Sequence, residues 1–199
     1  MPATNINQLP QDCFIAIRDS GGNTYNIYYS DKNYSFYKIN GKNLGSLVIG
    51  LSEENPTKLI YEVIGVNSER GFGPLLYDIA MELVNKLTNG KGYLKPASNG
   101  VSDAAVNIWD NYFKRSDVNK RPLDSLQNQI TPTKIDNVDM DVPKDKYGDN
   151  PKLSGPQQPW YNKPLSNGYQ KSISNLNSDR ILMIQESKIK TIEFIIKGK

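Results

Sequence analysis

The chain contains no histidine, and it contains a single cysteine, Cys13. The absence of histidine excludes Ser-His-Asp and Cys-His nucleophilic sites and every His-ligated metal site, and one thiol cannot build a cysteine-based zinc site. One thiol also cannot form an intramolecular disulfide, so no disulfide framework points to an oxidising compartment. Catalysis would therefore depend on carboxylates, hydroxyl groups, Lys, Arg and backbone amides, without a protein-held metal. We interpret Cys13 as a small buried apolar residue.

The chain also lacks a large excess of charge and a long apolar run. Its 24 basic and 21 acidic residues give a formal net charge of +3, which is too balanced to indicate nucleic-acid binding. No stretch approaches the ~20 apolar residues of a transmembrane helix. Residues 1–12 show neither the basic region nor the apolar region of a signal peptide. We therefore expect a cytoplasmic location and neither a membrane nor a nucleic acid as partner.

The apolar content is modest, and it is distributed unevenly along the chain. Hydrophobic residues make up 37% of the 199 positions, which suits one domain of moderate size and leaves part of the chain outside the core. Seven of the 12 prolines fall between residues 122 and 164, where almost no periodicity is visible. We divide the chain into an irregular lead at 1–12, a domain at 13–120, a proline-rich arm or linker at 121–177, and a C-terminal helix, or alternatively a strand, at 178–199.

The predicted domain begins with strands. Short runs of β-branched and aromatic residues alternate with Gly, Asn and Asp clusters over residues 14–51, a pattern that predicts an antiparallel meander. A stronger strand follows at 58–66. Pro74 then begins a helix whose apolar residues recur at helical spacing until Leu87, and Asn89-Gly90 ends it.

A short strand at 92–95 and a second helix complete the predicted domain. Ser102 is a suitable N-cap for this helix, which we expect to end near Lys114. The apolar face of the helix carries Trp109 and Tyr112. Together these elements predict an α/β (α+β) fold, in which helices flank a mixed, largely antiparallel sheet.

The segment whose residues best suit ligand binding is Arg70–Pro74, which joins the strong strand to the first helix. Glycines at such a turn let backbone N–H groups converge on an anion, and the helix N-terminus adds partial positive charge. The segment lacks the Lys-Ser/Thr of a Walker A loop and the third glycine of the Rossmann fingerprint. A coenzyme A pyrophosphate is the remaining ligand candidate, and a plain tight turn is the alternative.

At this point the sequence resembles the GNAT family of acyl-CoA-dependent N-acetyltransferases. Gly71 and Gly73 match the two glycines of the family's signature loop, which follows its fourth strand, and Leu75 and Leu76 match the leucines of the next helix. Ser68 stands where the family has Arg or Gln. The resemblance covers roughly residues 14–125, and it extends to uncharacterised GNAT-like proteins of tailed bacteriophages.

The resemblance implies that the chain transfers an acetyl group from acetyl-CoA, or another acyl group from its acyl-CoA, to an unidentified amine by direct attack. It implies that Glu62 is the base and that Tyr112 is a substitute acid, because Trp109 occupies the family's tyrosine position. The implied cofactor-binding residues are Val63, Ile64, Val66, Arg70, Gly71, Phe72, Gly73 and Pro74. The simpler interpretations remain a solvated Glu62 and core positions for Tyr112 and Trp109.

A second hypothesis comes from a different functional class. A viral protein could keep this fold without catalysis and use it for assembly or for contact with a host protein. The arm at 121–177, in which Trp160-Tyr161 could act as an anchor, would then contact a virion or host protein. The protein would be found in the host cytoplasm or in the virion.

Overall fold

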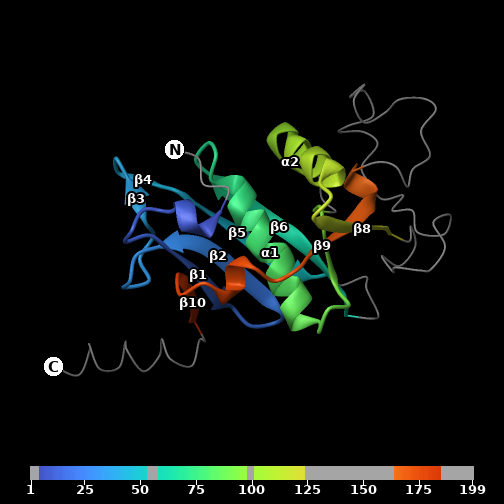
Figure 1. Ribbon diagram of the computed structural model, residues 1–199, viewed down its shortest axis with the longest axis horizontal. Coiled ribbons are helices and arrows are strands. Elements are labelled where there is room, and N and C mark those ends of the chain that lie inside the picture. The colour runs from blue at the N-terminus through green and yellow to red at the C-terminus, as the bar shows by residue number, and fades with distance from the viewer. Residues whose placement is uncertain (1–4, 53–57, 98–100, 124–163, 185–199) are drawn as a thin grey trace. The chain divides into compact units, whose positions relative to one another are not determined.

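The computed structural model describes residues 5–52, 58–97, 101–123 and 164–184. Over these residues the chain forms a mixed α/β structure in which two α-helices flank a mostly antiparallel sheet (Figure 1). The coarse prediction of the fold class is therefore confirmed. None of the described helices has the length and apolar character that crossing a membrane would need.

The elements follow one another in this order: the 3-10 helix η1 (Ile6–Gln8), β1 (Phe14–Asp19), β2 (Thr24–Ser30), β3 (Lys38–Ile39), β4 (Lys42–Asn43), β5 (Gly45–Leu51), β6 (Ile60–Ser68), α1 (Gly73–Leu87), β7 (Tyr93–Lys95), α2 (Asp103–Lys114), β8 (Val118–Pro122), the 3-10 helix η3 (Pro164–Ser166), β9 (Asn167–Lys171), the 3-10 helix η4 (Asn175–Asn177) and β10 (Ile181–Ile184).

The chain divides into two compact units that alternate along the sequence. Unit 1 consists of Met1–Gly50, Ile64–Ala80 and Ser174–Lys199, and unit 2 consists of Leu51–Val63 and Met81–Ile173. Strand β6 and helix α1 each begin in one unit and end in the other.

Unit 1 contains strands in the order β10-β1-β2-β5, followed by the second part of β6. Strand β1 is antiparallel to β2 and parallel to β10, and β2 is antiparallel to β5. Alternate residues along these strands place one row of side chains on a single face. The apolar residues at the centre of this face are fully buried, and they include Ile15, Ile17, Ile27, Leu47 and Ile49.

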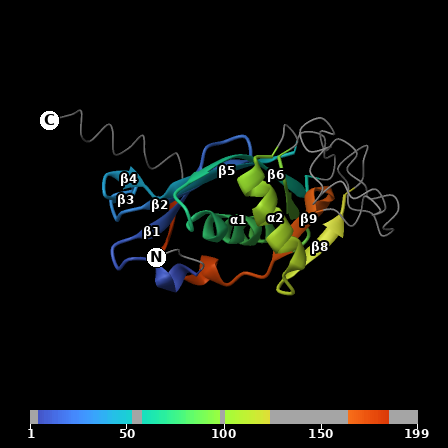
Figure 2. The ribbon, with the colours of Figure 1, turned by 90° about the horizontal axis from the view of Figure 1, so that it is seen from above.

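The first turns of α1 cover this buried face of unit 1 (Figure 2). Leu75, Leu76 and Ile79 recur at helical spacing and are fully buried. Tyr29 lies on the same sheet face as Ile15, its cross-strand partner. The periodicity that predicts the helix is therefore the periodicity of its contact with the sheet.

Unit 2 contains the first part of β6, then β7, β9 and β8. Strands β6 and β7 are parallel, β7 is antiparallel to β9, and β9 is antiparallel to β8. Trp109 of α2 packs on Tyr169 of β9, with ring centroids 4.9 Å apart. Both side chains are fully buried, which confirms the expectation that Trp109 is a core residue.

The predicted helix ends are present in the structure. The Ser102 hydroxyl accepts the amide of Ala105 at the start of α2. After α1, Asn89 and Gly90 both adopt positive φ angles, and the Gly90 amide donates to the carbonyl of Asn85. These signals were readable because a cap depends on residues only a few positions apart.

The structure differs from the sequence prediction after residue 121. Strand β9, within the predicted arm at 121–177, pairs with β7 and β8. Residues 181–184, for which we preferred a helix, form strand β10 beside β1. Pairing with distant strands decides both cases: the sequence of β9 has no strand periodicity of its own, and the four consecutive apolar residues of β10 fit either a helix or a strand. Residues 124–163, including Trp160-Tyr161, and residues 185–199 lie outside the described residues.

Candidate functional site

The segment between β6 and α1 forms a tight turn in unit 1. The amide of Phe72 donates to the carbonyl of Glu69 at 3.1 Å, and Gly71 within the turn has a φ of 91°. This backbone conformation is costly for any residue with a Cβ atom. The amide of Glu69 is held in turn by the carbonyl of Leu44 at 2.9 Å. The turn is therefore fixed at both ends by backbone hydrogen bonds.

Phe72 anchors this turn to the core of unit 1. Its ring is buried and meets the ring of Tyr29 edge-on, with centroids 5.4 Å apart. The Tyr29 hydroxyl donates to the Phe72 carbonyl at 2.7 Å. Since the Phe72 amide and carbonyl both have protein partners, this predicted cofactor residue serves to position the turn.

The remaining residues of the turn have a different environment. Arg70 is exposed, Gly71 is half-buried and Gly73 is buried. Across the part of the chain that the structure describes, the amides of Arg70 and Gly71 donate no hydrogen bond. Pro74 has no N–H group, and the first turn of α1 carries no acidic residue. The partial positive charge of this helix end is therefore not neutralised by its own first turn.

Strand β6 leads directly into this turn. Its register with β7 covers Ile60–Glu62, and the strand continues to Ser68. Beyond Val63, which is buried, the strand becomes exposed: Ile64 is 57% exposed and Val66 38%. The backbone of Ile64–Val66 is thus in an extended conformation at an exposed part of the strand.

Glu62, the predicted base, forms an ion pair with Lys95 within unit 2. The two residues are cross-strand neighbours on β6 and β7, and Lys95 Nζ lies 3.5 Å from Glu62 Oε2. The Lys95 side chain is 1% exposed and that of Glu62 27%. The sequence analysis missed Lys95, and only the strand pairing identifies it.

Tyr112, the predicted acid, is a core residue of unit 2. It is 2% exposed, its ring centroid lies 6.1 Å from that of Trp109, and the Arg115 guanidinium lies 4.9 Å from its ring. The simpler interpretation of Tyr112 as a packing residue therefore fits its surroundings. Glu62 and Tyr112 belong to unit 2, whereas Arg70–Pro74 belong to unit 1.

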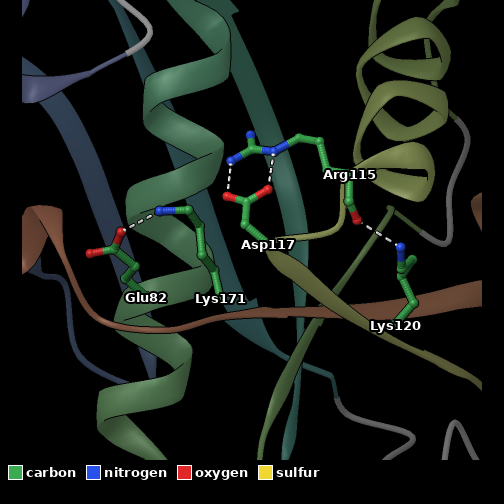
Figure 3. A network of polar contacts seen from close by, with 5 residues as sticks. All are labelled: Glu82, Arg115, Asp117, Lys120 and Lys171. Atoms are coloured by element: carbon green, nitrogen blue, oxygen red, sulfur yellow. Dashed lines mark hydrogen bonds and ion pairs between the residues drawn. The ribbon is translucent and has the colours of Figure 1, made fainter.

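Unit 2 also holds polar contacts that the sequence analysis did not find (Figure 3). Lys171 Nζ of β9 lies 2.9 Å from Glu82 Oε1 of α1. Arg115 binds the carboxylate of Asp117 through two donors, and this contact lowers the pKa of Asp117. Lys120 donates to the Arg115 carbonyl at 2.7 Å. The first contact joins α1 to β9, and the others join the C-terminal end of α2 to β8.

Neither metal chemistry nor thiol chemistry is supported by the described residues. They contain no group of three or more His, Cys, Asp or Glu side chains that could hold a metal ion. Cys13 is fully buried, as expected, and burial raises the pKa of its thiol to about 12. No family model matches the sequence, and comparison with curated proteins and with solved structures finds no match.

Proposed function

We propose that this chain is an acyl-CoA-dependent N-acyltransferase that binds acetyl-CoA, or another acyl-CoA, and acylates an amine. The observation that carries the proposal is the path of the backbone through residues 64–73. An exposed extended strand runs into a glycine turn whose Arg70 and Gly71 amides have no partner within the described residues. The N-terminus of α1 follows immediately.

The order of elements supports the same proposal. In chain order β6 is the fourth strand of the larger sheet, after β1, β2 and β5. The glycine turn, helix α1, the short parallel strand β7 and helix α2 follow it. This is the order that the resemblance to the GNAT family implies for its signature loop and the elements after it.

In the proposed mode of binding, the pantetheine arm pairs with the backbone of Ile64–Val66. The pyrophosphate lies against the amides of Arg70 and Gly71, where the helix end and the Arg70 guanidinium favour negative charge. Phe72 and Gly73 hold the turn, and Pro74 starts the helix behind it. No covalent enzyme intermediate is needed for this chemistry.

The proposed reaction balances with one base. The amine nitrogen attacks the thioester carbonyl carbon, a backbone N–H polarises the carbonyl, and the C–S bond breaks to release CoA as a thiolate. Glu62 accepts the proton that the amine loses, directly or through water. Because Tyr112 is buried, the thiolate would take its proton from water or from the protonated Glu62.

Calorimetric titration with acetyl-CoA tests the binding step. We expect saturable heat with the unmodified protein and a large loss of affinity for Arg70→Glu, because this variant places a negative charge beside the pyrophosphate. Lys38→Glu is the matched control: Lys38 is exposed on β3 in the same unit, and its reversal should leave the affinity nearly unchanged. No heat at millimolar acetyl-CoA would contradict the proposal.

A second function is favoured by the environment of the two predicted catalytic side chains. Glu62 is held by a buried lysine and Tyr112 is almost inaccessible, which suits a fold kept for binding rather than catalysis. In this alternative the chain is an inactive viral protein that contacts a virion or host protein. It predicts that such a complex survives Arg70→Glu. Acyl transfer that is lost in Glu62→Gln, with acetyl-CoA binding intact, would contradict it.

A further inference from the structure

The junction between β4 and β5 lies against the end of β6, within unit 1. Gly45 is the first residue of β5, and Ser68 is the last residue of β6. A Cβ atom on Gly45 would lie 2.6 Å from Ser68 Cβ, 2.7 Å from Ser68 Cα and 2.8 Å from the carbonyl oxygen of Asn67. Two of these three atoms belong to the backbone, so rotation of a side chain could not relieve the contacts. Only glycine therefore permits this approach of the two strands.

The backbone of Gly45 also adopts a conformation that favours glycine. Its φ is 147°, a value that residues with a Cβ atom rarely adopt. Gly41, in the turn between β3 and β4, has a φ of 79°, but a Cβ atom there would have no neighbour within 4 Å. Gly41 thus requires glycine for its conformation alone, whereas Gly45 requires it for the approach to β6 as well.

The same junction holds the glycine turn that follows β6. The carbonyl of Leu44 accepts the amide of Glu69 at 2.9 Å, and the carbonyl of Glu69 accepts the amide of Phe72 at 3.1 Å. These hydrogen bonds connect the residue before Gly45 to the residue before helix α1. Lys42 Nζ also lies 3.9 Å from Glu69 Oε1, but both side chains are exposed, so this ion pair adds little. The position of the turn therefore depends on the backbone of the junction.

We propose that Gly45 is a positioning residue of the proposed acyl-CoA site. It acts through Glu69, whose place in the turn determines where the amides of Arg70 and Gly71 lie. The inference rests on the proposed function, which assigns these two amides to the pyrophosphate. The missing Cβ atom of Gly45 lets β5 and β6 approach until the carbonyl of Leu44 reaches the amide of Glu69.

The size of the displacement explains why ligand binding depends on this glycine. Carbon atoms normally pack about 3.5–4.0 Å apart, so a Cβ atom at 2.6 Å would force the two strands apart by roughly 1 Å. Hydrogen bonds from amides to oxygen are confined to about 2.7–3.2 Å. A shift of this size would weaken the bond between Leu44 and Glu69 and misplace the amides that the pyrophosphate needs.

Gly45→Ala and Gly41→Ala are the matched variants that test the proposal. Both add a Cβ atom at a positive φ, but only Gly45→Ala forces the junction away from β6. Calorimetry at a temperature where both variants are folded should show a loss of acetyl-CoA affinity of roughly tenfold or more for Gly45→Ala, and less than about twofold for Gly41→Ala. Hydrogen exchange of the Glu69 and Phe72 amides, measured without ligand, should rise roughly tenfold in Gly45→Ala alone.

A second pair of variants serves where Gly45→Ala does not fold. Ser68→Gly removes the nearest of the three contacts and leaves the two backbone contacts, so the displacement becomes smaller. Gly45→Ala/Ser68→Gly should therefore still bind acetyl-CoA more weakly than Gly41→Ala/Ser68→Gly. The exchange of the Glu69 amide should also remain faster in the first of these two proteins.

Two results would overturn the proposal. One is a Gly45→Ala protein that binds acetyl-CoA as tightly as Gly41→Ala does. The other is unchanged exchange of the Glu69 and Phe72 amides in Gly45→Ala. Absence of heat with the unmodified protein would instead overturn the proposed function, and the exchange measurement would still decide whether Gly45 positions the turn.

Discussion

The carboxylate of Glu82 and the ammonium group of Lys171 form an ion pair 2.9 Å long between α1 and β9. The Glu82 side chain is 0% exposed, so its charge has little access to water. Asn85, almost one turn further along α1, donates through its side-chain amide to the Lys171 carbonyl at 2.8 Å. Helix α1 thus binds β9 through an ion pair and through a hydrogen bond to a backbone carbonyl of that strand. The sequence analysis assigned β9 to the proline-rich arm or linker.

Lys171→Met should strongly destabilise the protein. It leaves the buried Glu82 carboxylate without its cation, a change that typically costs about 3–5 kcal/mol. The double variant Glu82→Leu/Lys171→Met removes both charges and should recover much of this loss. Urea unfolding at equilibrium measures both. Equal stability of the single and double variants would show that the pair does not govern the cost.

Gly71→Ala should impair acetyl-CoA binding beyond its effect on folding. The positive φ of Gly71 makes any Cβ atom cost roughly 1–2 kcal/mol. Gly41, in the turn between β3 and β4, has a φ of 79° and should lose similar stability when changed to Ala. Only the Gly71 variant should also lose affinity in calorimetry. An equal loss of affinity in the Gly71 and Gly41 variants would show that the turn at Gly71 does not bind the ligand.

Tyr29→Phe should loosen the start of α1 while keeping the packing of the ring. The variant removes the buried hydrogen bond from the Tyr29 hydroxyl to the Phe72 carbonyl, at a cost of about 0.5–1.5 kcal/mol. Tyr37→Phe removes an exposed hydroxyl bonded to Asp12 and should cost less. Thermal unfolding measures both variants, and Tyr29→Phe should lower the melting temperature more than Tyr37→Phe does. A larger decrease for Tyr37→Phe would contradict the prediction.

The thiol of Cys13 should be nearly unreactive in the folded protein. Burial raises the pKa of this thiol from its ordinary value to about 12, so little thiolate exists at pH 8. The native state therefore keeps the thiol proton to a higher pH than the unfolded state does. The free energy of unfolding should accordingly fall as pH rises above about 9. Labelling with a chromogenic disulfide should follow unfolding by urea. Fast labelling without urea would disprove the burial.

Asp117 should contribute to stability only above the acidic range. Its hydrogen bond with Arg115 lowers the pKa of the carboxyl group, so the unfolded state binds its proton first as pH falls. The contribution is present above about pH 4 and decreases below it. Both side chains are partly exposed, which limits the effect to about 1 kcal/mol or less. The melting temperatures of the unmodified protein and Asp117→Asn should converge between pH 6 and pH 3.

The sequence by itself determined the elements whose signals are local. The repeating apolar residues from Leu75 to Leu87, the cap at Ser102 and the turn residues Asn89-Gly90 depend on positions only a few residues apart, and they predicted α1 and α2 correctly. The meander of β1, β2 and β5 was readable for the same reason. The glycines of the turn at 70–73 marked a strand-to-helix connection, which the structure contains.

Tertiary structure alone decided which distant groups meet. Strand β9 carries few apolar residues, and β10 carries only four, so neither has a periodicity that fixes its conformation; β7, β8 and β1 supply the hydrogen bonds that make them strands. The partners of Glu62 and Glu82, Lys95 and Lys171, are distant in sequence. A charge becomes buried only when the surrounding elements exclude water from it, and this depends on contacts that a local pattern does not contain.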